Sequence, residues 1–313
     1  MSQITIYDHE YLGTHTGIKN TLEDTIIDSA NKGYYTIQIF LGSPYNLKRR
    51  DITKEDIIKS NKLLNIVNLN IFTHLPYIHN LAGSVKNNCL HWGNSSSDQY
   101  ILESLASIEQ EIKFLDKLNC RRKGAVLHIG SSGKFSTQEG LDKVIISINK
   151  IKFDEQSEES SFSAKPRAKL ILETMVGRGG VLGKTFEELR YVYSLVDRKD
   201  RIGFCIDTCH VFAEGLYDLR KKEEIDKMFD DFDRVLGIDK LCLIHLNDSK
   251  TLFNSKQDKH ACIGHGEIFK NIKSLQYLLK KINDYKISTV LETEEQDYDV
   301  IQKAWDLMSD EIK

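Results

Sequence analysis

The chain has 313 residues, a formal net charge of −3 and 28% charged residues, which is the composition of an ordinary globular protein. No apolar run approaches the roughly 18–20 residues that a membrane-spanning helix needs. The N-terminal sequence MSQITIYDHE lacks the basic flank and the apolar core of a secretory signal. The small net charge gives no general argument for binding to nucleic acid. We therefore expect an intracellular protein that is neither secreted nor embedded in a membrane.

Cysteines and basic clusters give little functional information. The six cysteines form no Cys-x-x-Cys pair and lie mostly in apolar runs, so we expect reduced core thiols. Positive charge is concentrated in two short clusters, Lys48–Arg50 and Arg121–Lys123. Such clusters are usually solvated surface, so neither by itself indicates a ligand.

Short apolar runs with the length of buried strands recur along the chain. Between them lie segments with helical periodicity, such as Ile101–Leu115 and Ile272–Ile282. This alternation predicts a parallel sheet with crossover helices. The eight predicted strands are Ile4–Gly13, Tyr35–Gly42, Asn70–His74, Ala125–Gly130, Lys169–Thr174, Ile202–Asp207, Leu241–Asn247 and Thr289–Thr293.

Eight strand–helix units in a chain of this length favour an α/β fold of the (β/α)8 TIM-barrel type over an open doubly wound sheet. No Gly-x-Gly-x-x-Gly motif follows the first strand, which also argues against a dinucleotide-binding fold. No linker divides the chain, so residues 1–313 are predicted to form a single domain. An acidic, serine-rich segment near residues 154–166 is interpreted as a surface insertion on the face away from the active site.

The predicted strands end in side chains that can bind metals. In a (β/α)8 barrel the carboxyl ends of all strands share one rim. One such residue alone is more often a hydrogen-bonded core histidine or, as for Asp207, a cap of the following helix. Burying many carboxylates together is costly without cations, so the whole pattern predicts a site for several metal ions. The candidate ligands are His74, His128, Glu173, Asp207, His210, His245, Asp258, His260 and Glu292.

These five imidazoles and four carboxylates, with no thiolate, suit zinc or manganese. At about three to four ligands per ion they would hold two or three ions. Such a site stabilises the attacking and leaving oxygens of an in-line phosphoryl displacement, and it generates hydroxide near neutral pH. Phosphodiester hydrolysis is therefore the predicted chemistry.

Four longer motifs are CIDTCHVFAEGLYDLR, HLNDSK, DKHACIGHGEI and LETMVGRGGVLG. In these motifs the chain resembles the endonuclease IV family of apurinic/apyrimidinic (AP) endonucleases, class II enzymes with three zinc ions on a (β/α)8 barrel. The resemblance runs from Gly13-Thr14-His15 to Leu291-Glu292-Thr293. The turns at His128–Ser132 and Glu173-Thr174 depart from the usual family sequence, and this affects support of the ligands rather than their identity.

The resemblance implies three zinc ions per chain, with manganese as an alternative at one site. All nine candidate residues fall on ligand positions of the family. By this correspondence the first ion takes His74, His128 and the bridging Glu173, the second takes Glu173, Asp207, His245 and Glu292, and the third takes His210, Asp258 and His260.

The resemblance also implies hydrolysis of the phosphodiester on the 5′ side of an abasic site, without AP lyase chemistry, to leave a 3′-hydroxyl. Removal of blocked 3′ ends, as a 3′-phosphatase or 3′-diesterase, is expected too. The implied nucleophile is a hydroxide between the first two zincs, and the catalytic residue that orients or deprotonates it is Glu173 or Glu292. The expected partner is double-stranded DNA with abasic sites or blocked 3′ ends. We expect a monomer in the cytoplasm or nucleus or, for a viral protein, in the viral particle or factory.

Family members insert side chains from the loops after strands 2 and 3 into the DNA stack, which costs a few kcal/mol of unstacking. Tyr77 and Ile78 match the wedge after strand 3. Ordinary packing beside Pro76 is the alternative interpretation of this pair. In the strand 2 loop the family often has Arg or Gln, and here Tyr45 is the candidate that would stack on a base instead.

Two other functions compete with a nuclease. A metal-dependent sugar isomerase or epimerase on the same barrel would use Glu173, Asp207, His245 and Glu292, but it has no use for the third group of ligands. A degenerate barrel that only binds DNA or protein would show eroded ligands, and none of the nine is eroded.

Overall fold

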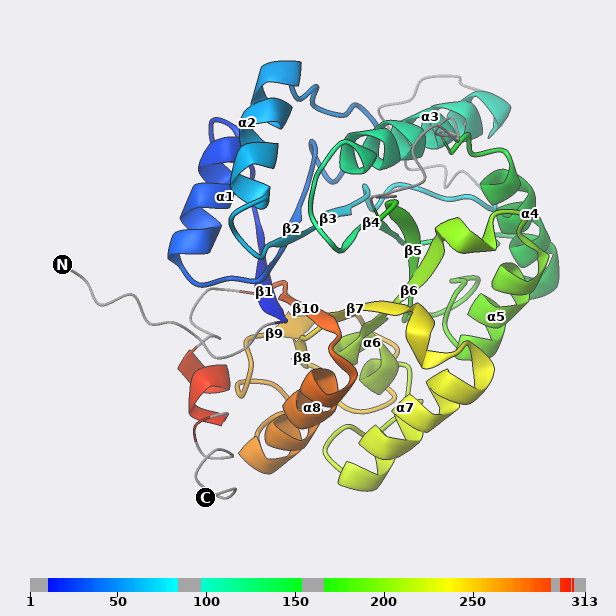
Figure 1. Cartoon of the computed structure of the whole chain (residues 1–313). Coiled ribbons are helices and arrows are strands. Elements are labelled where there is room, and N and C mark those ends of the chain that lie inside the picture. The colour runs from blue at the N-terminus through cyan, green and yellow to red at the C-terminus, as the bar shows by residue number, and fades with distance from the viewer. Residues whose placement is uncertain (1–10, 84–96, 154–165, 294–298, 305, 307–313) are drawn as a thin grey trace.

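Eight parallel strands close into a barrel in the computed structural model (Figure 1). The structure describes residues 11–83, 97–153, 166–293, 299–304 and 306. Around the barrel the order is β1, β10, β7, β6, β5, β4, β3, β2, which is the predicted (β/α)8 TIM barrel. The barrel strands are β1 (Leu12–Thr16), β2 (Thr36–Ile39), β3 (Asn70–His74), β4 (Lys123–Leu127), β5 (Lys169–Glu173), β6 (Ile202–Asp207), β7 (Leu241–His245) and β10 (Ser288–Leu291).

Helices connect the strands and cover the outside of the barrel (Figure 1). Several begin at a Thr or Ser whose side chain accepts a backbone N–H of the first turn. The start of α4 is a full capping box, in which Ser136 and Glu139 each accept the backbone N–H of the other. The helices are α1 (Leu22–Asn31), α2 (Lys54–Leu64), α3 (Ser97–Asp116), α4 (Thr137–Asn149), α5 (Phe186–Leu195), α6 (Thr208–Ala213), α7 (Lys222–Val235) and α8 (Ile272–Tyr285), with 3-10 turns at Lys199–Arg201 and Ile238–Lys240.

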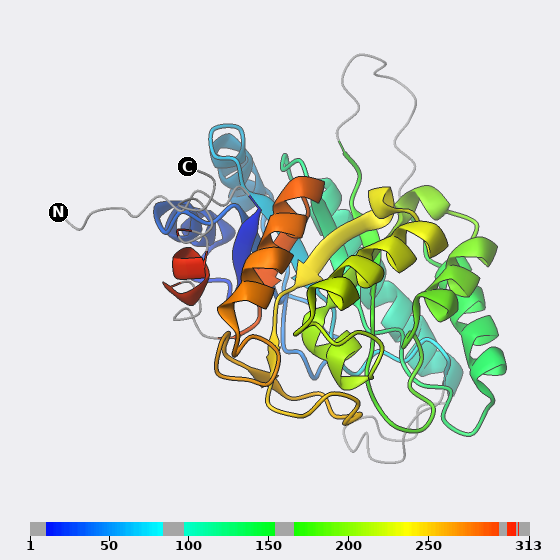
Figure 2. The same cartoon turned by 90° about the horizontal axis from the view of Figure 1, so that it is seen from below.

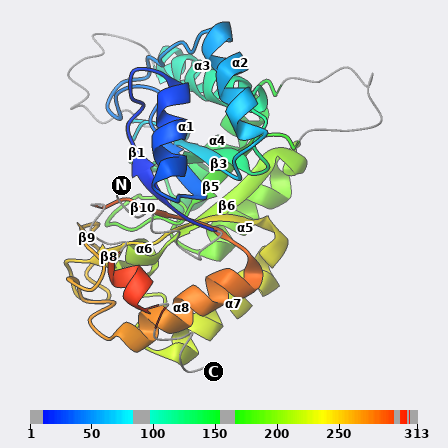
Figure 3. The same ribbon diagram turned by 60° about the vertical axis from the view of Figure 1, so that its left-hand side comes forward.

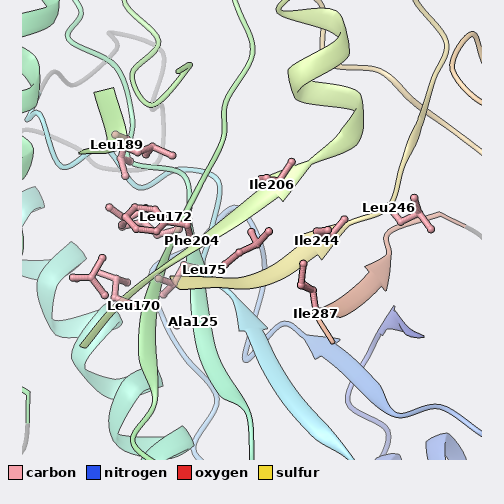
Figure 4. Packing of buried hydrophobic residues seen from close by; sticks show 14 of the residues in the cluster. Leu75, Ala125, Leu170, Leu172, Leu189, Phe204, Ile206, Ile244, Leu246 and Ile287 are labelled. Atoms are coloured by element: carbon pink, nitrogen blue, oxygen red, sulfur yellow. The ribbon is translucent and has the colours of Figure 1, made fainter. Parts of the chain in front are cut away.

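The main hydrophobic core lies between the strands and the surrounding helices. Figure 4 shows part of it, including Leu170 and Leu172 of β5 and Phe204 and Ile206 of β6, all fully buried. Because successive strand residues point to opposite faces, the residues between these positions face the barrel interior.

A second, smaller apolar cluster fills that interior. Its members come from six different strands and are almost fully buried. They form a packed layer, as expected for a barrel of this size, and the carboxyl ends of the strands lie above it. The cluster consists of Phe72, Val126, Ile171, Cys205, Leu243 and Val290.

The long loop after β7 extends the carboxyl-terminal rim. It contains the antiparallel ladder of β8 (Asp248–Ser249) and β9 (His260–Ala261), which the sequence did not predict. Figure 2 shows this loop at the end of the barrel toward which the yellow β7 arrow points. Figure 3 shows α7 and α8 side by side on the outer surface.

The position of the first strand differs from the prediction. The sequence predicts Ile4–Gly13, but β1 is Leu12–Thr16, and residues 1–10 lie outside the described residues. Apolar content favours the earlier run, whereas β1 is built from small and polar residues that fit a close contact. A Cβ added at Gly13 would lie 1.5 Å from the carbonyl oxygen of Thr36 on β2.

Two further expectations depend on what the structure describes. The predicted insertion near 154–166 falls on residues 154–165, which lie outside the described ranges, so its location stays a prediction. A search of the described helices finds none that is both long and apolar enough to cross a membrane.

Candidate metal centre

Six of the nine candidate ligands form the layer directly above the apolar interior of the barrel. In six strands the residue two positions after the interior apolar residue is His, Asp or Glu. Because side chains alternate along a strand, a spacing of two keeps both residues on the inward face. The pairs are Phe72–His74, Val126–His128, Ile171–Glu173, Cys205–Asp207, Leu243–His245 and Val290–Glu292.

The first group contains His74, His128 and Glu173, whose ligand atoms all lie within 4.8 Å of one another. Nε2 of His74 and of His128 lie 3.4 and 2.9 Å from Oε2 of Glu173. Nδ1 of His74 donates to the carbonyl oxygen of Leu75 at 2.7 Å. Because a carbonyl oxygen can only accept, this contact leaves the Nε2 lone pair of His74 free to face Glu173.

The second group contains Asp207, His245 and Glu292, again within 4.8 Å. Nδ1 of His245 lies 2.9 Å from Oε1 of Glu173 and 3.4 Å from Oε2 of Glu292. Its Nε2 lies 2.8 Å from Oε1 of Gln38, and Nε2 of Gln38 donates to Oε1 of Glu292 at 2.8 Å. The second contact fixes the orientation of the Gln38 amide, so Nε2 of His245 must donate to it. The Nδ1 of His245 then faces two carboxylates, an arrangement that requires a proton or a cation between them.

The third group contains His210, Asp258 and His260. Nε2 of His210 and Nε2 of His260 each lie 3.1 Å from a different oxygen of Asp258. Nδ1 of His210 donates to the carbonyl oxygen of Thr174 at 2.7 Å, which directs its Nε2 toward Asp258. Asp258 and His260 lie on the loop that contains β9, so this loop completes the group.

Asp207 connects the second and third groups, and it combines the two roles considered for it. One carboxylate oxygen accepts the backbone N–H of His210 at 2.9 Å and caps α6. The other accepts from the Asn247 amide at 2.7 Å and lies 3.5 Å from Nε2 of His260. A helix cap and a candidate ligand are therefore formed by different oxygens of one side chain.

Cys209 also lies within 4.8 Å of Asp207 and His260, but burial raises the pKa of its thiol, which disfavours a thiolate.

Opposite charges stabilise each other throughout this layer. Burial alone would raise the pKa of Glu292, but the neighbouring His245 lowers it to about 2. Burial would lower the pKa of His260, but Asp207 and Asp258 raise it to about 9. Glu173 shows the same balance, because His245 and His128 lower its pKa well below the usual value despite its burial.

The residues fit metal ions on the evidence of their own hydrogen bonds. Oε2 of Glu173, Nε2 of His210 and Nε2 of His260 are buried, and their short contacts with other candidate ligands lack the geometry of hydrogen bonds. Buried polar atoms without partners are rare and costly. These atoms lie close to nitrogen and oxygen atoms of other candidate ligands. Together they form a set of nitrogen and oxygen donors of the kind that zinc binds.

Three residues of the site were not predicted from the sequence. Gln38 on β2 contacts His245 and Glu292 as described above, and its Nε2 lies 3.0 Å from Nδ1 of His15 on β1. The Asn247 amide donates to both Asp207 and Glu292, at 2.7 and 3.0 Å. Gln38 is a fully buried polar residue between Ile37 and Ile39, so the composition of β2 is the signal that could have indicated it.

The candidate DNA-contact residues lie beside the first group. The Tyr77 ring is 5.0 Å from that of His74 and 5.4 Å from that of His128, measured between centroids. Tyr45 is 72% exposed and lies 6.1 Å from Tyr77. The backbone N–H of Tyr77 donates to the carbonyl oxygen of Pro44 at 2.9 Å, which joins the two loops. Ile78 is half-buried, and its carbonyl oxygen accepts the hydroxyl of Tyr100.

Known proteins are similar to most of this chain. A family model described as Xylose isomerase-like TIM barrel matches residues 27–310. A probable endonuclease 4 from Staphylococcus aureus is 30% identical over 285 residues, which cover 90% of this chain and 87% of that protein.

Two solved structures show the same fold at lower identity. Endonuclease IV from Thermus thermophilus has a TM-score of 0.74 and 20% identity, over 96% of this chain and 99% of that chain. A D-tagatose 3-epimerase-like protein has a TM-score of 0.63 and 17% identity, over 97% of this chain and 100% of that chain.

Proposed function

Because the chain belongs to the Xylose isomerase-like TIM barrel family and, within it, to the endonuclease 4 proteins, we propose that it is a DNA-repair AP endonuclease. The reaction proposed is hydrolysis of the phosphodiester on the 5′ side of an abasic site in duplex DNA, which leaves a 3′-hydroxyl. Removal of a 3′-phosphate or another 3′ block is proposed as a second activity, because it is displacement at the same kind of phosphorus atom.

The observation that carries this proposal is the third group of candidate ligands beside the first two. His210, Asp258 and His260 come within 4.8 Å of one another, and Asp207 links them to the second group. An in-line displacement develops charge on both the attacking and the leaving oxygen, and a site with several cations can stabilise both.

We assign three zinc ions to the three groups, with manganese as an alternative at one of them. Zinc at these positions would supply Lewis acidity toward the phosphate and lower the pKa of bound water. The chain itself holds the ligands in position. Gln38 and the Leu75 carbonyl fix the tautomers of His245 and His74, and Asn247 holds the carboxylates of Asp207 and Glu292.

Glu173 and Glu292 are the candidates for orienting and deprotonating the attacking water. Both lie in the inward-facing layer, and the pKa of each is held below its usual value by neighbouring histidines despite burial. Both carboxylates are therefore ionised near neutral pH. Glu292 also accepts from Gln38, whereas Oε2 of Glu173 has no hydrogen-bond partner among the described residues. Because both are ionised, either carboxylate can act as the proton acceptor, and both stay candidates for this role.

Tyr77, with Tyr45 beside it, is proposed to contact the DNA stack next to the extruded abasic sugar. Both rings are exposed at the edge of the first group, where an extruded sugar would enter the site. Ile78 is proposed to support Tyr77 and to contact the bases from a half-buried position. The partner is thus duplex DNA with an abasic site or a blocked 3′ end, bound by a monomer.

A sugar isomerase or epimerase is the alternative function, and the epimerase-like structure shows that the fold alone allows it. The third group of ligands favours the nuclease, because an isomerase would need only the residues of the second group and Glu173.

Incubation of the purified protein with a duplex that has a single abasic site tests the proposal. We expect a nick 5′ to the site without added magnesium, loss of activity after prolonged incubation with phenanthroline, and recovery with zinc. Metal analysis that shows one ion per chain, together with aldose–ketose conversion and no nicking, would contradict the proposal and support the alternative.

A further inference from the structure

A cavity of about 370 Å³ lies at the opposite end of the barrel from the candidate metal centre. Phe72, from the apolar layer, lines it, whereas His74 lies two residues further along β3 in the ligand layer. The other lining residues lie at the amino-terminal ends of β4, β5 and β7 or in the segments that precede β4, β5, β7 and β10. The cavity is therefore separated from the metal centre by the packed interior of the barrel.

Positive charge dominates the lining of this cavity. The basic cluster Arg121–Lys123 forms part of it, and segments distant in sequence contribute the rest. Asp239 is the carboxylate in the lining, and it pairs with Lys240 at 2.9 Å. The cationic lining residues are Arg121, Arg122, Lys123, Arg167, Lys169 and Lys286.

Several of these cations have no ion-pair partner in the part of the chain that the structure describes. No described carboxylate lies within 4.0 Å of the charged groups of Arg121, Arg167, Lys169 or Lys286. Like charges gathered around one concave space repel each other, and an anion in that space would remove the repulsion. Exposed cations on a convex surface would instead be separated by water.

Part of the cavity wall is held rigidly. Lys123 is 5% exposed, and its ammonium donates to the carbonyl oxygen of Leu118 at 2.6 Å. The guanidinium of Arg122 donates to the carbonyl oxygen of Lys286, which joins the turns before β4 and β10. Burial raises the pKa of the Cys242 thiol on the cavity wall, and the charges of Lys169 and Arg122 oppose this rise. Arg122 immediately precedes β4 and Lys169 is the first residue of β5, so cations from two segments distant in sequence act on this part of the wall.

We propose that this cavity binds an anion with a diphosphate or triphosphate group. Guanidinium groups pair with phosphate oxygens in a bidentate manner, and several cations that converge on a small volume match a ligand with concentrated charge. The volume is in the range of small-ligand sites, roughly 300–1,000 Å³. A duplex backbone spreads single charges over a long convex path, so it fits this concave space less well. Tyr285 at the cavity offers a ring on which a nucleotide base can stack.

Calorimetric titration of the zinc-loaded protein with pyrophosphate, ATP and adenosine, in about 150 mM salt, tests the proposal. The metal centre can also bind phosphate, so a cavity variant decides the location. The double variant R167A/K286A is expected to lose one pyrophosphate site, or to weaken it at least tenfold, while the nicking activity stays unchanged. The matched control is K62A/K273A, which removes two exposed lysines from α2 and α8 and should bind as the wild type does.

The source of the phosphate is distinguished by the ligands themselves. If ATP and pyrophosphate bind with similar affinity, the cavity recognises the phosphates alone. If ATP binds more tightly than pyrophosphate and Tyr285→Ala removes this difference, the ligand of the cavity is a nucleotide. Adenosine alone should not bind. The proposal is wrong if neither phosphate ligand binds the wild type, or if R167A/K286A and K62A/K273A bind alike. R167A/K286A is expected to lose the pyrophosphate site in the cavity. The proposal is also wrong if intact duplex DNA displaces pyrophosphate from that site in the wild type. The binding outcomes do not depend on whether the protein nicks abasic DNA.

Discussion

Arg49 and Glu111 form an ion pair at 3.2 Å in which both side chains are 0% exposed. Arg49 belongs to the loop after β2, and Glu111 lies on α3. The same guanidinium donates to the carbonyl oxygens of Ser43, Asn46 and Leu47. One buried side chain therefore holds the loop that carries Tyr45 in a fixed shape. The loop is joined in turn to Tyr77 by the Pro44 carbonyl.

Replacement of this arginine by lysine should separate DNA binding from chemistry. A lysine at position 49 can still pair with Glu111, but its single ammonium cannot reach three carbonyl oxygens at once. We expect Arg49→Lys to raise KM for the abasic duplex about tenfold, with kcat within about twofold of the wild-type value. Faster amide hydrogen exchange at residues 43–47 would show directly that the loop has become mobile.

A second arginine–carboxylate pair, in which the arginine is buried and Asp116 is half-buried, provides the control. Arg201 and Asp116 lie 2.6 Å apart at the amino-terminal end of the barrel, far from the candidate metal centre. Arg201→Lys is the same chemical change and should lower stability without changing KM. Equal KM values for the two variants would mean that Arg49 has only a structural role.

Gln38 is predicted to control the metal affinity of the second group. Gln38→Leu removes the acceptor that fixes His245 and the donor to Glu292, and it leaves a side chain of similar size. Loss of such supporting contacts typically lowers metal affinity or activity by about 10- to 100-fold. We expect that loss in kcat/KM, with zinc released from the variant at lower chelator concentration than from the wild type. Unchanged activity and zinc retention would show that His245 does not need the contact.

The success of the sequence prediction depended on how local each signal was. His210 could be named as a candidate ligand because it lies three residues from Asp207, at the end of a clear apolar strand. Gln38 and His15 were missed because their strands are short and partly polar, and their role emerges only when β1 and β2 close the barrel beside β10. The Arg49–Glu111 pair could not be predicted either, since its partners are 62 residues apart and each looks like a surface charge in the sequence.

His260 tests the third group of ligands. His260→Ala removes one of the two imidazoles that face Asp258 and leaves β9 and its hydrogen bonds in place. We expect one zinc fewer per chain by metal analysis and a fall in nicking activity of well over tenfold, with an unchanged circular dichroism spectrum. His265→Ala, an exposed residue of the same loop, is the matched control and should behave as the wild type. Wild-type rates in His260→Ala would mean that the third-metal assignment is wrong.

His79 gives a prediction about stability and pH. It is buried, neither ring nitrogen has a hydrogen-bond partner among the described residues, and burial together with the nearby Arg49 charge lowers its pKa to about 3. The unfolded chain takes up a proton below a pH of about 6.5, but the native state does not until about pH 3. This residue therefore lowers the free energy of unfolding as pH falls through that window, by up to about 1.4 kcal/mol per pH unit.

His79→Leu should remove this contribution. Urea unfolding at several pH values between about 7 and 4.5 is expected to show a shallower loss of stability in the variant than in the wild type, because the leucine cannot take up a proton in the unfolded chain. Any release of bound metal on acidification would affect both proteins alike, so the difference between their curves isolates His79. His265→Leu, at an exposed position, should give a curve parallel to the wild type. If the stability curve of His79→Leu is also parallel to that of the wild type, the histidine must accept a proton in the native state. Its burial then does not limit acid stability.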